Sequence, residues 1–353
     1  MKITINKKDK SRMGEVDFEN LGFGTDFSDH MFVMDYDDGE WHDPRIVPFE
    51  NLSVSPAMMT LHYAQTIFEG LKAYRTVDGD ISVFRPHEHA RRLNVSAERL
   101  CIPEVDTLLF MDALKKLLEL DREWVPKKKG DSLYIRPFVF ATDEYLGVGI
   151  SKSYKFMIIT SPVSLYYKEG LNPVSLVTSG EYSRACPGGT GYVKAGGNYA
   201  ASLYPAKLAK DAGYTQVLWL DGLEHRYVEE VGTMNIFFYF NDELVTPPLS
   251  GTILGGITRD SVIDLAREWG VTVNVRRITI DEVLERAEKG ELKEAFGTGT
   301  AAIISPVGKI AHGEKEVIVN DYETGELSHQ LYDRLSKIRY GEMEDPYDWC
   351  LRL

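Results

Sequence analysis

Cysteine is scarce in this sequence, which disfavours the protein classes that depend on it. The 353 residues include three cysteines, Cys101, Cys186 and Cys350, which lie far apart and form no CxxC pair. This spacing argues against a disulfide framework and against a zinc site, so no metal is expected. It favours a reducing compartment, and we expect a cytoplasmic protein.

Long apolar runs, an excess of basic residues and internal repeats are also missing. The longest apolar runs, such as residues 234–240, are too short to span a bilayer, and the N-terminal residues form no apolar signal core. The 40 basic against 54 acidic residues give a net charge of −14, which argues against binding to nucleic acid or to an anionic membrane. The length favours two domains.

The patterns that are present predict a mixed α/β chain. Strands are expected at residues 31–36, 68–74, 81–84, 133–141, 155–160, 173–178, 216–220, 234–240 and 271–277. Helices are expected at about residues 86–100, 106–124, 198–212, 258–269, 280–289 and 322–339. Asn198 is a candidate N-cap of its helix, and Pro205 should kink that helix or mark its true start.

The glycine-rich residues 188–199 surround one lysine, Lys194. Glycine lets a backbone turn sharply and approach a ligand closely. An amine held in such a loop is placed to form a Schiff base with a carbonyl substrate or with pyridoxal phosphate. The same residues also fit an ordinary solvated turn. A phosphate-binding loop with bound magnesium is disfavoured, because Ala195 follows Lys194 where a hydroxyl is needed.

Other segments have the chemistry to complete a cofactor site. Residues 254–259 lead into a helical pattern, and residues 297–301 form a small-residue turn; both could bind an anion through backbone N–H groups, and both fit a plain helix start or turn. Glu229 and Glu230 precede an apolar strand. Strand alternation should turn one of them inward, although both could instead lie in solvent at the strand edge.

Together these segments resemble the branched-chain amino acid aminotransferases, within the fold-type IV pyridoxal phosphate enzymes. The matching strings follow the family's order over nearly the whole chain: Phe23-Gly24, Phe27-Ser28-Asp29-His30-Met31, Leu61-His62-Tyr63, Phe68-Glu69-Gly70-Leu71-Lys72-Ala73, Phe84-Arg85-Pro86, Tyr134-Ile135-Arg136-Pro137, the Lys194 loop, Gln216-Val217-Leu218-Trp219-Leu220-Asp221-Gly222, Glu230 to Phe237 and Gly297 to Ala301. The resemblance implies a two-domain fold like that of D-amino acid aminotransferase. It places a small N-terminal α/β domain at residues 1–165, a linker at 166–183 and a large C-terminal domain at 184–353, with the cofactor between the domains.

The resemblance also implies roles in binding pyridoxal 5′-phosphate. Lys194 would form the Schiff base with the cofactor and later move a proton between the substrate Cα and the cofactor C4′. Glu230 would pair with the pyridine nitrogen, and Tyr199 would hydrogen-bond the phenolic oxygen. The phosphate and the rest of the cofactor would be held by Arg92, Arg184, Thr233, Ile257, Thr258 and Thr300.

For the substrate, the resemblance implies an aromatic pocket and a homodimer. The α-carboxylate would meet the Thr300-Ala301 turn and the hydroxyl of Tyr63 from the partner subunit, and Arg136 would bind the γ-carboxylate of glutamate. Leu146 and Val148 match a loop that closes over the other subunit's site. The aliphatic side chain would lie among Phe23, Phe68, Tyr134, Tyr166 and Met234.

The implied reaction is transamination of L-leucine, L-isoleucine and L-valine with 2-oxoglutarate, the last step of branched-chain amino acid synthesis and the first of breakdown. A lyase of the same fold, a D-amino acid aminotransferase and a non-catalytic phosphate-binding protein are the alternatives. The aromatic set and the Tyr134-Ile135-Arg136 string disfavour the first two, and the isolated Lys194 disfavours the third. Ala302 and Ser305 stand where some animal members have a CxxC pair, so no thiol switch of that kind is expected.

Overall fold

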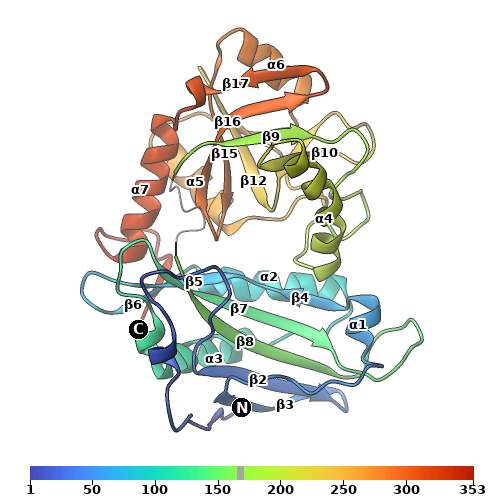
Figure 1. Cartoon of the computed structure of the whole chain (residues 1–353), viewed down its shortest axis with the longest axis vertical. Helices are drawn as coiled ribbons and strands as arrows, with labels where there is room; N and C mark the ends of the chain where they lie inside the picture. Colours follow the sequence, from blue (N-terminus) through green and yellow to red (C-terminus); the bar gives the residue numbers. More distant parts are fainter. Residues whose placement is uncertain (165–170) are drawn as a thin grey trace. The chain divides into compact units, whose positions relative to one another are not determined.

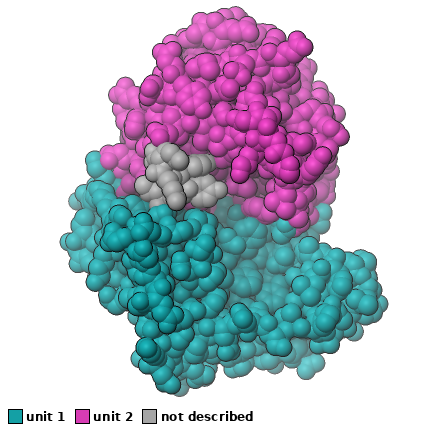
Figure 2. Space-filling model, viewed as in Figure 1, with its two compact units in different colours: residues 1–166, 193–196, 337–353 teal, residues 167–192, 197–336 magenta. Residues whose placement is uncertain are grey.

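The computed structural model describes residues 1–164 and 171–353, and its mixed α/β architecture confirms the expected fold class (Figure 1). Two compact units divide the chain (Figure 2). Unit 1 comprises Met1–Tyr166, Val193–Gly196 and Lys337–Leu353, and unit 2 comprises Tyr167–Tyr192 and Gly197–Ser336.

Two segments from later in the chain belong to unit 1. The C-terminal strand β18 (Cys350–Arg352) pairs with β6 (Ile81–Phe84), so the end of the chain completes the sheet of unit 1. Residues 193–196 are tied to the same unit through a β-bridge between Ile67 and Ala195. Neither contact has a signal in the local sequence pattern, because both join residues more than a hundred positions apart.

The sheet of unit 1 is antiparallel except for one parallel pair at its edge, β1 with β3. Its strands lie in the order β1 (Thr4–Ile5), β3 (Glu40–Pro48), β2 (His30–Asp37), β8 (Tyr154–Val163), β7 (Ser132–Ala141), β5 (Leu71–Arg75), β6 and β18, with β4 (Thr66–Phe68) also paired to β7. The helical segments of this unit are α1 (Met59–Tyr63), α2 (Pro86–Arg99), α3 (Thr107–Leu120) and the short 3-10 turns η1 (Met13–Glu15) and η2 (Arg122–Trp124).

Helices α2 and α3 supply the apolar side chains that form a core with this sheet. Proline at the first turn of α2 suits a helix start, and the Asp106 side chain caps α3 by accepting from the backbone N–H groups of Leu108 and Leu109. Leu93, Leu114 and strand residues such as Ile135 are buried together. The predicted helix 106–124 is therefore α3 followed by η2, rather than one helix.

The predicted strand 68–74 is interrupted at Glu69 and Gly70, which separate β4 from β5. Both short strands pair with β7, and their registers are continuous with each other: Phe68 lies opposite Phe138, and Leu71 lies opposite Ile135. The interruption lies opposite Pro137, whose nitrogen has no hydrogen to donate to the ladder, although its carbonyl accepts from the Glu69 N–H at 2.7 Å. The break leaves Glu69 outside both strands, in the step between β4 and β5.

In unit 2, part of the sheet closes into a ring. The strands β11 (Val228–Val231), β10 (Gln216–Leu220), β9 (Val174–Thr178), β16 (Ile303–His312), β15 (Leu292–Gly299) and β12 (Met234–Phe240) follow one another, and β12 pairs back with β11. The sheet continues through β13 (Leu244–Thr246) and β14 (Val273–Val275), with β17 (Lys315–Ile318) beside β16. The predicted strand 271–277 is thus shorter, and it pairs in parallel with β13.

The helical elements of unit 2 are α4 (Gly196–Asp211), α5 (Ile257–Glu268), α6 (Ile280–Glu288), α7 (Glu326–Tyr340) and η3 (Asn320–Tyr322), with the ends of α4 and α7 counted in unit 1. Helix α4 begins two residues before Asn198, so Asn198 is not its N-cap, and Pro205 lies inside the helix rather than at its start. Across the described residues, none of the helices combines the length and apolarity needed to cross a membrane. In that same part of the chain, no three His, Cys, Asp or Glu side chains are grouped to hold a metal ion.

Candidate active site

The main chain of Lys194 is held on both sides within unit 1. Its N–H donates to the Ser96 hydroxyl at 3.1 Å, and its carbonyl accepts from the Phe68 N–H at 3.0 Å. The Lys194 ammonium lies 4.8 Å from the centre of the Phe68 ring, a distance at which a cation is attracted to the ring face. Lys194 is therefore a half-buried lysine with a fixed backbone, and the solvated-turn interpretation does not fit.

The residues that flank this segment form a clasp in unit 2. The Thr190 hydroxyl donates to the Asn198 side-chain carbonyl at 2.6 Å, and the Asn198 amide donates to the Thr190 carbonyl at 2.7 Å. Asn198 thus closes the loop instead of capping α4. Gly191 is needed here for space, because an added Cβ would lie 2.3 Å from the Thr252 carbonyl oxygen.

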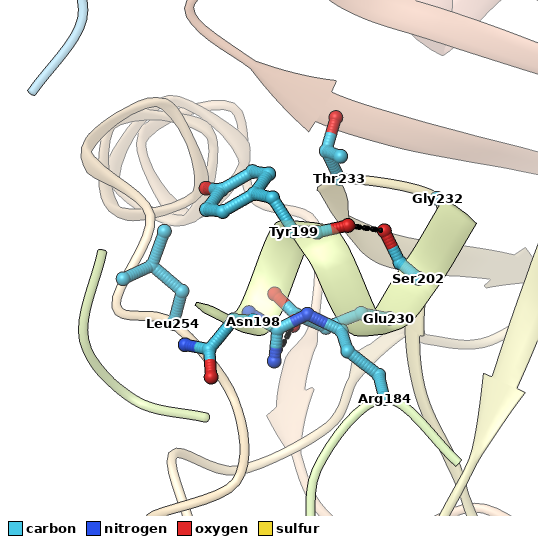
Figure 3. Close-up of a pocket in the computed structure, with 8 residues that line it drawn as sticks. All are labelled: Arg184, Asn198, Tyr199, Ser202, Glu230, Gly232, Thr233 and Leu254. Carbon is cyan, nitrogen blue, oxygen red and sulfur yellow. Dashed lines mark hydrogen bonds and ion pairs between the residues drawn. The ribbon is translucent and has the colours of Figure 1, made fainter. Parts of the chain in front are cut away.

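Glu230 lines a pocket in unit 2, among the residues drawn in Figure 3. One carboxylate oxygen lies 2.7 Å from Nη1 of Arg184, and the other accepts from the Asn235 amide at 3.1 Å. Arg184 is held in turn by the carbonyls of Gly191 and Thr252. A carboxylate oriented by a buried arginine and an amide is suited to meet a cationic ring nitrogen.

Both adjacent acids, Glu229 and Glu230, are buried, so neither lies in solvent at the strand edge. Strand β11 belongs to the closed ring, and all four of its residues are buried. Burial raises the pKa of Glu229, and a hydrogen bond from the Thr252 hydroxyl opposes that rise. The two neighbours therefore have different partners: Thr252 for Glu229, and Arg184 with Asn235 for Glu230.

The rest of the pocket wall combines polar side chains with Leu254 and the backbone of Gly232. Tyr199, Ser202, Thr233 and Leu254 line it with Arg184, Asn198, Glu230 and Gly232 (Figure 3). The space among these residues, including the part open to solvent, measures about 290 Å³. The predicted residues Arg184, Tyr199, Glu230 and Thr233 are thus brought together in one pocket.

Asn235 links this pocket to the start of α5. Its amide also donates to the Leu254 carbonyl at 2.8 Å, and a Cβ on Gly256 would lie 1.9 Å from its Oδ1, so glycine is needed at that turn. Gly256 is the N-cap of α5 and contributes no capping side chain, and Ile257 and Thr258 are the first two residues of this helix. Thr300 and Ala301 lie in the turn that joins β15 to β16.

In unit 1 the predicted phosphate residue Arg92 is paired with a residue that the sequence reasoning did not single out. Glu69 binds the Arg92 guanidinium through both carboxylate oxygens, at 2.7 and 2.8 Å, and also contacts His89 at 2.6 Å. The signal in the sequence is an acid between Phe68 and Gly70 in a mostly apolar strand pattern. A buried acid there implies a buried cation, but the pattern does not say which one.

Four predicted substrate residues of unit 1, Arg136, Phe68, Tyr134 and Phe23, form one connected group. Arg136 lies 4.6 Å from the Phe68 ring centre and 5.2 Å from that of Tyr134, and its Nη2 donates to the Tyr134 hydroxyl at 3.0 Å. Phe23 packs against Tyr134 with 5.1 Å between ring centres. An aromatic wall with one cation can accept either an aliphatic chain or a carboxylate.

The remaining predicted residues lie elsewhere or outside the described part. Met234 begins β12 in unit 2, with its side chain against Gly297 and Gly299. Tyr63 ends α1, and its hydroxyl donates to the carbonyl of Leu146. Tyr166 lies outside the described residues.

Comparison with known proteins places this arrangement in one family. The model of the amino-transferase class IV family matches residues 66–310. Branched-chain-amino-acid aminotransferase 2 of Bacillus subtilis is 50% identical over 350 residues, which is 99% of this chain and 95% of that protein. The branched-chain-amino-acid aminotransferase of Mycobacterium tuberculosis is 47% identical over 338 residues, covering 94% of this chain and 92% of that protein.

Solved structures agree with these relatives. The crystal structure of the Escherichia coli branched-chain amino acid aminotransferase matches with a TM-score of 0.76 at 28% identity, covering 91% of this chain and 98% of that one. The T.th. branched-chain amino acid aminotransferase, complexed with N-(5′-phosphopyridoxyl)-L-glutamate, matches with a TM-score of 0.74 at 27% identity, covering 94% and 98%. The chain therefore belongs to the class IV aminotransferase family, among its branched-chain amino acid aminotransferases.

Proposed function

We propose that this protein transfers the amino group of L-leucine, L-isoleucine or L-valine to 2-oxoglutarate, giving branched-chain 2-oxo acids and L-glutamate. The near full-length similarity to the Bacillus subtilis and Mycobacterium tuberculosis enzymes supports this reaction. The structural observation that carries the proposal is the fixed backbone of Lys194, because proton transfer requires an amine held near one atom of a bound substrate.

The donor set fits pyridoxal 5′-phosphate, which when bound supplies an electron sink for negative charge at the substrate Cα. Glu230, oriented by Arg184 and Asn235, would keep the pyridine nitrogen protonated. The hydroxyl of Tyr199 would hydrogen-bond the phenolic oxygen of the ring. The phosphate would be held by Arg92, by the α5 start at Ile257 and Thr258, and by Thr300, with Thr233 beside the ring.

The family membership of the chain supports roles for its aromatic and polar residues in binding the substrate. Lys194 would take the proton from the substrate Cα and deliver it to the cofactor C4′. Arg136 would bind the γ-carboxylate of glutamate, and the Thr300-Ala301 turn would bind the α-carboxylate. The aliphatic side chains would lie among Phe23, Phe68, Tyr134, Tyr166 and Met234.

We also propose that the protein works as a homodimer in the cytoplasm. Leu146 and Val148 are 63% and 85% exposed, a degree unusual for neighbouring apolar side chains unless another surface covers them. The Tyr63 hydroxyl is bonded to the same loop. In this proposal the loop and Tyr63 reach the site of the partner subunit. The free thiols of Cys101, Cys186 and Cys350 are compatible with a reducing compartment.

The first test is an absorbance titration of the purified yellow protein. We expect L-leucine to remove the visible band of the bound cofactor and 2-oxoglutarate to restore it, which demonstrates both half-reactions. D-leucine should leave the band unchanged. A yellow protein that ignores L-leucine would contradict the substrate assignment and favour the lyase or the D-amino acid alternative.

Replacing Lys194 tests the catalytic assignment directly. Lys194→Ala should abolish turnover while the far-ultraviolet circular dichroism and the melting temperature stay near those of the wild type. Lys210→Ala, an exposed lysine on α4, is the matched control and should retain full turnover. Full activity of Lys194→Ala would overturn the assignment.

A further inference from the structure

A fully buried carboxylate, Glu69, lies in the gap between β4 and β5. Its side chain is 0% exposed. A buried charge is costly unless it is paired and hydrogen-bonded, so the surroundings of Glu69 must supply both. The two partners, His89 and Arg92, lie three residues apart on α2 and therefore on neighbouring positions of one helix face.

The geometry of this cluster orients the guanidinium of Arg92. Its Nε donates to one oxygen of Glu69 and its Nη2 to the other, at 2.7 and 2.8 Å, which is the two-pronged arrangement that restricts rotation of the planar group. One edge of the guanidinium thus meets Glu69, and the end that carries Nη1 points away from that edge.

His89 contacts the same carboxylate, at the oxygen that also accepts from Nη2 of Arg92. Burial by itself raises the pKa of Glu69, but the charges of Arg92 and His89 outweigh it and hold that pKa well below its ordinary value. Burial lowers the pKa of His89, and the positive charges of Arg92 and Lys194 act in the same direction, although Glu69 opposes them. Because an ionised carboxylate only accepts hydrogen bonds, Nδ1 of His89 carries the proton and donates to Glu69 at 2.6 Å.

The cluster also belongs to the frame that holds Lys194. The Ser96 hydroxyl donates to the Arg92 carbonyl at 3.0 Å and accepts from the Lys194 N–H. On the other side, Phe68, next to Glu69 in the chain, donates its N–H to the Lys194 carbonyl. Glu69 therefore joins the strand and the helix that both fix the lysine.

We propose that Glu69 is a positioning residue that orients Arg92 toward the cofactor phosphate, with His89 as its second support. This inference rests on the proposed role of Arg92 in phosphate binding. It predicts a change in phosphate affinity that is opposite to the change expected from charge alone. Removing a negative charge beside a phosphate site should tighten phosphate binding by Coulomb attraction alone, whereas loss of orientation should weaken it.

The experiment compares pyridoxal 5′-phosphate with pyridoxal, which lacks the phosphate. Apoprotein is titrated with each compound, and the Kd is measured from the absorbance of the bound form. Glu69→Gln should raise the Kd for pyridoxal 5′-phosphate at least about tenfold, the loss expected for one charge-assisted hydrogen bond, and should leave the Kd for pyridoxal unchanged. His89→Asn should raise the Kd for pyridoxal 5′-phosphate by a smaller factor and should also leave the Kd for pyridoxal unchanged.

The controls separate positioning from other effects. Glu88→Gln removes a carboxylate from the same helix, one that pairs with Arg91 nearer the surface, and should change neither Kd. Tighter binding of pyridoxal 5′-phosphate by Glu69→Gln, or equal losses for both compounds, would overturn the proposal. If Glu69→Gln does not fold, His89→Asn becomes the test of the proposal. This variant removes one support of Glu69 and keeps the pair between Glu69 and Arg92.

Failure of the proposed function gives a different result. If wild-type protein binds the two compounds equally, or if Arg92→Gln leaves its preference unchanged, then Arg92 does not hold the phosphate. The proposed role of Glu69 would then be wrong as well, because it depends on the assignment of Arg92. If the wild type prefers pyridoxal 5′-phosphate, Arg92→Gln loses the preference and Glu69→Gln keeps it, only the positioning role is overturned.

Discussion

At Arg136 a single guanidinium lies against the rings of Phe68 and Tyr134 and donates to the hydroxyl of Tyr134. The rings suit the aliphatic chain of leucine, and the cation suits the second carboxylate of glutamate. In the proposed function this one group of side chains would serve both partners of a transamination, because the rings are apolar and the guanidinium can donate N–H groups to a carboxylate.

We predict that Arg136→Ala reduces kcat/KM for glutamate at least about tenfold more than for leucine, since a hydrogen bond to a charged group contributes ~1.5–3 kcal/mol. Leucine should lose some activity too, because the aromatic wall loses a packing neighbour. Arg136→Lys keeps the charge and should recover part of the glutamate activity. Equal losses for both substrates would show that Arg136 does not bind the second carboxylate.

At the scale of the element, the turn after β10 depends on one carboxylate. Asp221 accepts backbone hydrogen bonds from Leu223 and Glu224 on one oxygen and from Arg226 and Tyr227 on the other. Burial raises the pKa of Asp221, but the four N–H groups outweigh it and lower the pKa to about 2. The string that contains Asp221 is one of those that resemble the family, and the structure shows the local role of its carboxylate.

We predict that Asp221→Asn destabilises the protein by about 2 kcal/mol at neutral pH, because the amide cannot accept all four bonds. The folded-state pKa lies below the unfolded value of about 3.9, so this stabilisation is present above pH ~4 and is lost as pH falls toward 2. Urea unfolding of both proteins at pH 7 and near pH 3 measures the difference. A difference that does not shrink in acid would contradict this account.

The break between β4 and β5 shows how an element can serve a site. The strand pattern of residues 68–74 predicts one strand, and the register on β7 does run through the whole segment. Pro137 interrupts the ladder, and at Gly70 an added Cβ would lie 2.2 Å from the Tyr134 hydroxyl oxygen. The break between the two strands thus places Glu69 beside α2, and Gly70 leaves room for the Tyr134 ring.

At the scale of the whole molecule, the exposed loop of Leu146 and Val148 bears on the oligomeric state. We predict that Val148→Asp shifts the protein from dimer toward monomer, since a charge would be buried in the interface. Analytical ultracentrifugation over a range of concentrations measures the shift. Val77→Asp, at an apolar residue that is 65% exposed in the turn between β5 and β6, is the matched control. A wild-type protein that is monomeric throughout, or a Val148→Asp dimer of unchanged stability, would contradict the proposed interface.

Amphipathic periodicity by itself determined several elements closely. The patterns at residues 258–269 and 280–289 predict helices that the structure has at Ile257–Glu268 and Ile280–Glu288, because a helix places its apolar stripe by spacing alone. The ordered motifs likewise determined the family, and with it the expectation for Lys194. These signals are local, so the chain carries them before it folds.

Only the tertiary structure decided which distant groups meet. It closed the loop around Lys194 through Thr190 and Asn198, joined Glu69 to Arg92, and added β18 to the sheet of unit 1. Asn198 looked like a helix cap because the sequence shows its residue type but not the partner that its side chain reaches. Charge pairing and strand pairing depend on distances across the fold. Packing sets these distances, and the spacing of residues along the chain does not.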